Sequence, residues 1–169
     1  NGNVGDLLAY GSFGTVHNHP ENKDAVVKLS RFGSCAHLDR EKDALSRLAG
    51  VDGVVQHCDE HDVIKVQIRH STVEIPSLTL SPKGISFKAH AATLLTTDLD
   101  KYLVMVWKQL LQTLRDIHAK DVIHCDVTPN NIIIVNVNQS SASGEQQVKP
   151  VLIHFGVAFM GDEQFTGIV

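Results

Sequence analysis

The feature that most constrains the fold of this chain is a polar loop, Ile123–Asn131 (IHCDVTPNN), enclosed by apolar sequence. The loop follows the strongest helical pattern in the chain, over Leu99–Ala119. Apolar side chains recur there at steps of three and four residues, at Leu103, Trp107, Leu110, Leu114 and Ile117. A solvent-facing turn would carry similar polar residues. The apolar residues on both sides favour instead a loop whose ends are anchored in a core.

Two side chains of this loop can carry chemistry. Asp126 can orient an attacking hydroxyl group and accept its proton, and Asn131 can offer an oxygen ligand to Mg²⁺. Pro129 stiffens the irregular backbone between them. The loop is therefore the first candidate for a catalytic site.

The N-terminal part of the chain predicts three short strands joined by two turns. The strands are expected at Asp6–Ala9, Thr15–His19 and Ala25–Ser30, and the turns at Gly11–Gly14 and Pro20–Asp24. Two successive hairpin turns indicate an antiparallel meander. Glycines at both ends of the first turn would let backbone amides approach a phosphate closely. Taken alone, the glycines favour an ordinary hairpin turn over a phosphate-binding one.

A lysine in the third strand and a glutamate in the helix that follows form a second candidate site. Alternation along the strand places Val26 and Lys28 on one face. If the glycine turn covers a nucleotide, Lys28 can reach its phosphates, while Val16 and Val26 cover its base. A helix is predicted near 36–48, and Glu41 on it could hold the lysine in place. The alternative is a lysine and a glutamate that are both solvated, because most surface ion pairs contribute little.

The remaining segments give the outline of the fold. Val54–Leu80 predicts further strands whose pairing stays open, and the connector Leu80–Gly84 is the expected boundary between two lobes. Asn131–Val137 and Val151–Ile153 predict two short strands. The stretch between them, Asn138–Gln147, is polar, and no chemistry is assigned to it.

Composition excludes some partners. The net charge of −4 and the pI of about 6.2 argue against a nucleic-acid partner, which would require a strongly basic surface. No apolar run approaches membrane-spanning length, so no membrane partner is expected. The three cysteines lack regular spacing, which fits a reducing, intracellular compartment, either cytoplasmic or nuclear.

Several histidines and a cysteine could be zinc ligands. His57, Cys58 and His61 lie close together in the sequence, and so do His17 and His19. A structural zinc site needs four ligands in a paired arrangement, and no matching second pair is present. Ordinary strand and loop histidines are the favoured interpretation.

The order of these features resembles that of eukaryotic protein kinases. Gly11, Gly14 and Val16 match their glycine-rich loop G-x-G-x-x-G-x-V, with Ala9 in place of the first glycine. Lys28 matches the lysine of V-A-I-K, and Glu41 matches the helix glutamate. His124, Asp126 and Asn131 match H-R-D-L-x-x-x-N, and the segment His154–Gly156 matches D-F-G. Together these five motifs span nearly the whole chain.

The resemblance implies an α+β fold with two lobes. An N-lobe at residues 1–80 would contain an antiparallel sheet and one helix, and residues 81–84 would form the hinge. Residues 85–169 would form a partial, mainly helical C-lobe, because the A-P-E segment and later helices find no counterpart. The implied cofactors are ATP and Mg²⁺. The implied reaction is phosphoryl transfer to Ser or Thr hydroxyls of a protein substrate whose identity stays open.

The resemblance also implies a role for each site residue. Asp126 would be the catalytic base, Asn131 a metal ligand, and Lys28 with Glu41 the pair that anchors the phosphates. The nucleotide site would comprise Ala9, Gly11, Ser12, Phe13, Gly14, Val16, Val26, Lys28, Glu41 and Leu80.

Three residues depart from the pattern. Cys125 replaces the arginine that commonly receives an activation-loop phosphate, so control by that route is not expected. Thr128 replaces a lysine, a change that resembles variant kinases of herpesviruses and some fungi. His154 stands at the position of the metal-binding Asp, so a weakened metal site is expected.

These departures leave two further hypotheses open. The first is a pseudokinase that binds a nucleotide or a partner without phosphoryl transfer. The second is a small-molecule phosphotransferase with a similar H-x-D-x-x-x-x-N loop. The Phe13 turn and the Phe-Gly pair after His154 favour the protein kinase class over this second alternative.

Overall fold

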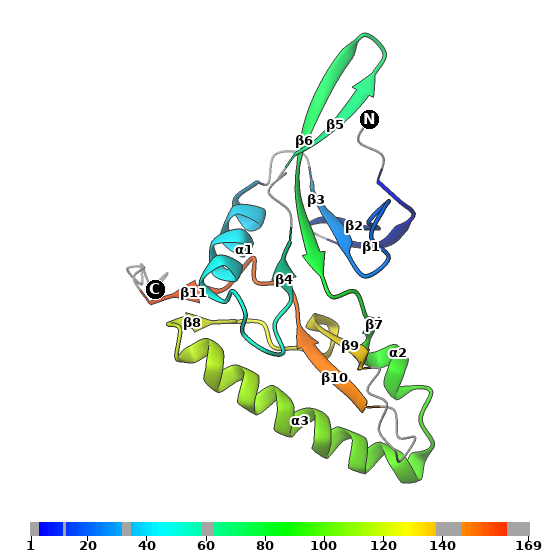
Figure 1. Cartoon of the computed structure of the whole chain (residues 1–169), viewed down its shortest axis with the longest axis vertical. Helices are drawn as coiled ribbons and strands as arrows, with labels where there is room; N and C mark the ends of the chain where they lie inside the picture. Colours follow the sequence, from blue (N-terminus) through cyan, green and yellow to red (C-terminus); the bar gives the residue numbers. More distant parts are fainter. Residues whose placement is uncertain (1–3, 12, 32–34, 59–62, 138–146, 162–169) are drawn as a thin grey trace.

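The fold of the chain is α+β with antiparallel sheets, as expected from the sequence. The computed structural model describes residues 4–11, 13–31, 35–58, 63–137 and 147–161. Its helices are α1 (Cys35–Arg47), α2 (Phe87–Ala91), α3 (Thr96–His118) and the 3₁₀ turn η1 (Pro129–Asn131). Figure 1 shows the largest sheet and α1 in one half of the molecule and α3 in the other.

The largest sheet contains the predicted meander and extends it with the strands of the 54–80 region. Its members are β1 (Leu7–Gly11), β2 (Gly14–Asn18), β3 (Val26–Ser30), β4 (Gln56–His57), β5 (Val63–Ile68) and β6 (Ser71–Ser81). Their order is β1-β2-β3-β6-β4. One end of β6 pairs with β5 in a hairpin that projects from the body, and the other end pairs with β3 and β4 (Figure 1). This arrangement supplies the pairing that the sequence left open.

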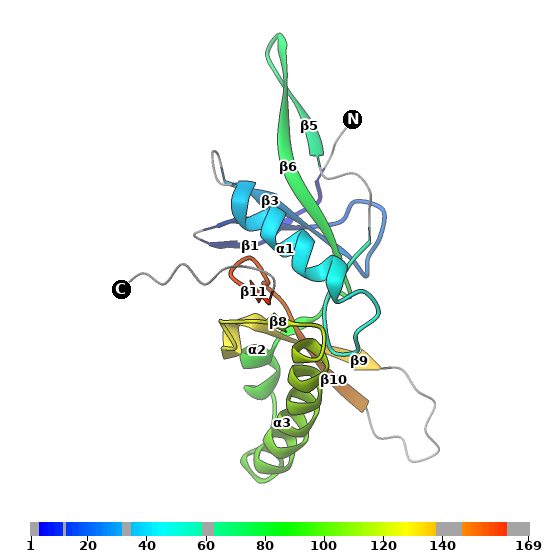
Figure 2. The same cartoon turned by 90° about the vertical axis from the view of Figure 1, so that its left-hand side faces the viewer.

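Two smaller sheets frame the polar loop. One has the order β10-β9-β7, formed by β7 (Ile85–Ser86), β9 (Ile132–Val137) and β10 (Gln147–Leu152). The other pairs β8 (Val122–Ile123) with β11 (Phe159–Met160). Figure 2 shows β8 and β11 lying between α1 and α3. The polar loop thus begins at a strand on one side and ends at a strand on the other.

One continuous core joins α1, α3 and the inner strands. Its most deeply buried side chains are Leu45, Leu48, Leu78, Leu110, Ile117, Ile134, Leu152 and Phe155. Of the residues predicted for the apolar face of α3, Leu110 and Ile117 are buried, and Leu103 and Leu114 are partly buried against the core, but Trp107 is 52% exposed. The face of α3 that is buried carries Tyr102, Val106, Leu110, Thr113 and Ile117. Within the part of the chain that the structure describes, no helix has the length and apolarity to cross a membrane.

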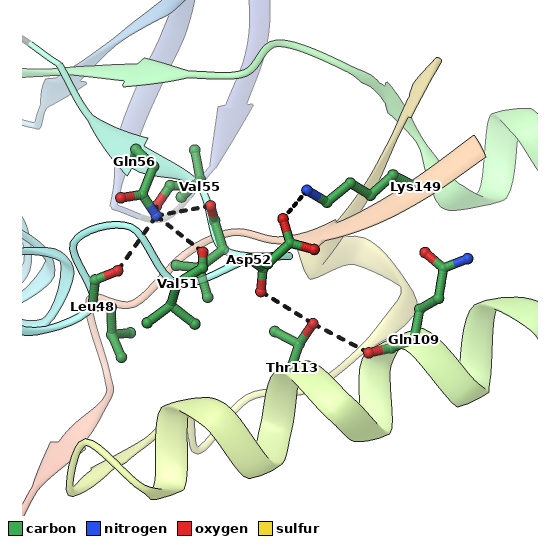
Figure 3. Close-up of polar contacts among 9 residues, drawn as sticks. Leu48, Val51, Asp52, Val55, Gln56, Gln109, Thr113 and Lys149 are labelled. Atoms are coloured by element: carbon green, nitrogen blue, oxygen red, sulfur yellow. Dashed lines mark hydrogen bonds and ion pairs between the residues drawn. The ribbon is translucent and has the colours of Figure 1, made fainter. Parts of the chain in front are cut away.

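The loop between α1 and β4 ties the two halves of the molecule together (Figure 3). Within the loop, the Gln56 amide nitrogen donates to the Val54 carbonyl at 3.0 Å and its oxygen accepts from the Gly50 N–H at 2.8 Å. Towards α3, the Thr113 hydroxyl donates to the Asp52 carbonyl at 3.4 Å. Towards β10, Asp52 forms an ion pair with Lys149. The loop thereby fixes α1 relative to β10, the strand that leads into residue 154.

The observed boundaries differ from the predicted ones by a few residues. Helix α1 begins one residue earlier than predicted, and α3 begins at Thr96 rather than at Leu99. The expected connector is shorter than predicted, because β6 continues to Ser81 and only Pro82–Gly84 separate it from β7. Helix α2 and the two-residue strands were not predicted, because such short elements carry too few residues for a periodic pattern.

Candidate functional site

One face of the largest sheet carries most of the predicted nucleotide-site residues. Val16 lies directly opposite Lys28, which lies opposite Leu78 on β6. In the same row Ala9 pairs with Val16, and two residues along β3 Val26 pairs with Leu80. Directly opposed residues in antiparallel strands point to the same side of a sheet. The structure therefore brings Ala9, Val16, Val26, Lys28 and Leu80 to one face, which the alternation along the strand predicted for Val26 and Lys28.

The Lys28 ammonium group forms an ion pair with the Glu41 carboxylate from α1. The Glu41 side chain is fully buried and that of Lys28 is 9% exposed. An isolated buried charge is strongly unfavourable, so each group depends on the other. The pair predicted from strand and helix positions is present, and the alternative of two solvated side chains is wrong.

Residues 153–156 lie against both the ion pair and the polar loop. The Phe155 N–H donates to Glu41 Oε1 at 3.2 Å, and the Ile153 N–H donates to the Asn131 carbonyl at 3.0 Å. His154 between them has a φ of 71°, in the left-handed region. Hydrogen bonds thus hold the backbone on both sides of His154, and they fix the position of its Cα–Cβ bond.

Lys28 donates a hydrogen bond to the His154 ring. Lys28 Nζ lies 3.3 Å from His154 Nδ1. An ammonium group can only donate, so His154 Nδ1 must accept. Burial lowers the pKa of His154, and the neighbouring positive charge of Lys28 lowers it further. The imidazole is therefore neutral, and its proton is on Nε2.

Helix α1 holds the segment after His154 with two further side chains. His37 Nδ1 lies 3.1 Å from the Gly156 carbonyl, and Arg40 donates to the Ala158 carbonyl at 2.8 Å. A side chain at residue 156 would meet the His37 carbonyl at 3.0 Å, so the close approach favours glycine. Neither His37 nor Arg40 was predicted as a site residue from the sequence. No local pattern marks them, because the carbonyl groups that they contact lie more than a hundred residues further along the sequence.

His124 is a buried structural residue of the polar loop. Its Nε2–H donates to the Ile153 carbonyl at 2.9 Å, and its Nδ1 accepts from the Asp126 N–H at 3.2 Å. Its ring packs edge-on against Phe155 at a centroid distance of 4.6 Å. Burial lowers the pKa of His124, so the ring is neutral in the folded protein.

The two polar side chains of the loop contact each other. Asn131 Nδ2 donates to the Asp126 carbonyl at 2.9 Å and to Asp126 Oδ2 at 2.6 Å. Both amide hydrogens are used in this way, so Oδ1 of Asn131 is the atom that can face a cation. Asp126 is partly exposed, which leaves its carboxylate accessible to a hydroxyl group.

The glycine turn lies next to His154. Gly11 pairs with Gly14 at the end of the β1–β2 hairpin. Gly14 has a φ of 152°, and a side chain there would meet the Leu29 carbonyl at 1.9 Å. The Phe13 ring lies 4.1 Å from the His37 ring and 5.3 Å from the His154 ring, measured between centroids. Ser12, which the sequence analysis also placed in the nucleotide site, lies outside the described residues.

The side chains present do not fit the Mg²⁺ ion that the resemblance implies. Asn131 can supply an oxygen ligand, but His154 Nδ1 is engaged by Lys28 and His154 Nε2 carries a hydrogen. Neither nitrogen of His154 can bind a cation in this arrangement. Among the described residues there is also no group of three or more His, Cys, Asp and Glu side chains placed to hold a metal.

Two of the histidines considered as zinc ligands, His17 and His19, have other partners. His17 Nδ1 lies 3.1 Å from the Gly5 carbonyl and its Nε2 lies 3.0 Å from the Thr15 hydroxyl. His19 Nδ1 accepts the N–H groups of the turn that follows it. His61 lies outside the described residues. These contacts fit the interpretation of His17 and His19 as ordinary strand and turn residues.

Comparison with known proteins adds no family assignment, because no protein-family model and no curated protein matches the chain.

The buried ion pair predicts a large loss of stability when its acidic partner is removed. Glu41→Ala leaves Lys28 without its counter-ion and the Phe155 N–H without its acceptor. We expect the free energy of unfolding in urea to fall by about 3 kcal/mol or more. Asp43→Ala on the exposed side of the same helix is the matched control, with an expected change within about 0.5 kcal/mol. Equal effects of the two variants would show that the pair does not stabilise the fold.

The neutral imidazoles predict that stability falls with acidity. The pKa of His124 and of His154 is lower in the folded protein than the value of about 6.5 in the unfolded chain. The unfolded chain therefore binds more protons below that pH, and the free energy of unfolding should decrease from about pH 7 to pH 5. In His124→Gln this decrease should be shallower, whereas His118→Gln at an exposed position should retain the parental slope. An unchanged slope in His124→Gln would contradict the assignment.

Proposed function

We propose that the chain is an ATP-binding domain of the protein kinase type, in which His154 impairs phosphoryl transfer. The observation that carries the proposal is the position of Lys28. It is paired with Glu41, it contacts residue 154, and it lies on the same sheet face as Val16 and Val26. An ammonium group next to apolar side chains on one sheet face is suited to a ligand with a flat base and a polyphosphate tail.

In this proposal each part of the site has one task. The apolar side chains of Val16, Val26 and Leu80 cover the adenine, and Lys28 holds the phosphates. The backbone of the Gly11–Gly14 turn closes over the phosphates. Asp126 accepts the proton of a Ser or Thr hydroxyl, in an orientation set by Asn131. The two lobes would be residues 1–80 and 85–169, with residues 81–84 as the hinge beside the adenine.

A second candidate function is a pseudokinase, a module that binds nucleotide without transferring phosphate. His154 favours it, because the metal-binding carboxylate of the resembling family is replaced by a ring whose nitrogens are not available to a cation. The choice of Ser or Thr as acceptor, and of a protein as substrate, rests on the resemblance alone.

Nucleotide binding can be tested by thermal unfolding with ATP, with and without Mg²⁺. A ligand at a hundred times its Kd should add about 2.7 kcal/mol to the free energy of unfolding. Lys28→Ala should abolish most of this gain, measured against its own unliganded baseline. Lys23→Ala removes an exposed lysine from the β2–β3 turn and should retain the gain. Absence of a shift with ATP under both conditions would rule out the proposed function.

The kinase and pseudokinase alternatives are separated by restoring a carboxylate. We expect little phosphate transfer by the parent protein with Mg²⁺, and more by His154→Asp, because a carboxylate supplies both an oxygen ligand and a negative charge. Transfer of labelled phosphate to a protein acceptor by the whole protein is the measurement. Equal activity of parent and variant would contradict an effect of His154. Inactivity of both proteins would support the pseudokinase alternative and would indicate Thr128 as a further cause of the lost transfer.

A further inference from the structure

The hydrogen bond from Lys28 leaves residue 154 with a hydrogen-bond donor, where a metal-binding aspartate would have only acceptors. Lys28 Nζ lies 3.3 Å from His154 Nδ1, and the same ammonium group forms the ion pair with Glu41. Because Nδ1 accepts, the neutral ring carries its hydrogen on Nε2. Residue 154 therefore presents an N–H donor, where an aspartate would present only acceptors. The ammonium group and the N–H donor lie on opposite edges of the same ring, an arrangement suited to different phosphates of one polyphosphate anion.

We propose that Lys28 and His154 together form an anion site that takes the phosphates of a nucleotide directly, without a divalent cation. The inference rests on the proposed nucleotide-binding function and specifies the form of the ligand. The bound species would be the free polyphosphate anion, with Lys28 as the charged donor and His154 Nε2–H as the second donor.

The position of His154 is suited to this role. Hydrogen bonds from the Ile153 N–H to Asn131 and from the Phe155 N–H to Glu41 fix the backbone on both sides. The Phe13 ring lies against the imidazole, with 5.3 Å between the ring centroids and an interplanar angle of 38°. The donor is thus held in place, so ordering it on binding costs little entropy.

The charges around the site suit an anion better with histidine at residue 154 than with aspartate. Glu41 and Lys28 neutralise each other, and the Asp126 carboxylate keeps its negative charge while it accepts from the Asn131 amide. His124 and His154 are neutral, because burial lowers the pKa of both rings. An aspartate at residue 154 would add one negative charge next to the phosphates, and that charge would need a cation to offset it. With histidine this requirement disappears.

The test is a comparison of ATP affinity in EDTA and in excess Mg²⁺, measured by calorimetry on the whole protein. The parent should bind ATP in EDTA at least as tightly as in Mg²⁺. His154→Asp should bind about tenfold or more weakly in EDTA, because a donor to a charged group is lost and a repelling charge is gained. The same variant should recover its affinity when Mg²⁺ is added.

Two further variants separate the donor from other effects. His154→Phe retains an aromatic ring against Phe13 without a nitrogen, and it should lose affinity in EDTA without recovering it in Mg²⁺. His70→Asp makes the same charge change at the exposed tip of the projecting β5–β6 hairpin and should behave like the parent protein (Figure 1). Thermal midpoints measured without ligand check that each variant is folded.

Each outcome bears on a different claim. A parent protein that binds ATP only with Mg²⁺ would overturn the anion site and leave the proposed nucleotide-binding function intact. His154→Asp and His154→Phe with parental affinity in both conditions would also overturn the anion site. Failure of the parent protein to bind ATP in either condition would overturn the proposed function and the anion site together.

Discussion

The buried pair between Lys28 and Glu41 is the interaction on which the rest of the site depends. Removing two charges from water is unfavourable, and the arrangement is stable only if each charge finds its partner and the remaining oxygen finds a donor. Phe155 supplies that donor through its backbone N–H, at 3.2 Å from Glu41 Oε1. The pair therefore specifies more than the distance between β3 and α1. It also determines where the segment after β10 crosses beneath the helix, and so where residue 154 lies.

The opposite side of that segment is fixed by the polar loop. His124 donates to the Ile153 carbonyl, and the carbonyl of Asn131 accepts from the Ile153 N–H. Asn131 also holds the Asp126 side chain. Residues of α1 and residues of the loop after α3 are far apart in the sequence. Both sets form hydrogen bonds with the same short segment. The α1–β4 loop contacts α3 through Thr113 and β10 through Lys149. These contacts hold α1 and the polar loop in a fixed relative position.

The parts that were predictable from the sequence are those that depend on local pattern. Alternation in β3 placed Val26 and Lys28 on one face, and a thirteen-residue helix carries Glu41 close to where it was expected. The pairing of β5 with β6 was not predictable, because apolar alternation shows that a strand exists but not which strand it joins. The contacts of Phe13 and His37 with residues 154–156 were also out of reach. They join positions more than a hundred residues apart, and neither side chain has a composition signal of its own.

The backbone explains how a histidine can occupy residue 154 while everything around it still fits. With φ at 71°, the position lies in the left-handed region, where Asn, Asp and His are the side chains most often found apart from glycine. Exchanging one of these for another leaves the backbone conformation, and hence the two flanking hydrogen bonds, unchanged. The exchange is therefore mild for folding and large for chemistry, since it turns an acceptor that attracts cations into a donor that attracts anions. Lys28 reinforces the change, because its hydrogen bond to Nδ1 selects the tautomer in which the outer nitrogen carries the hydrogen.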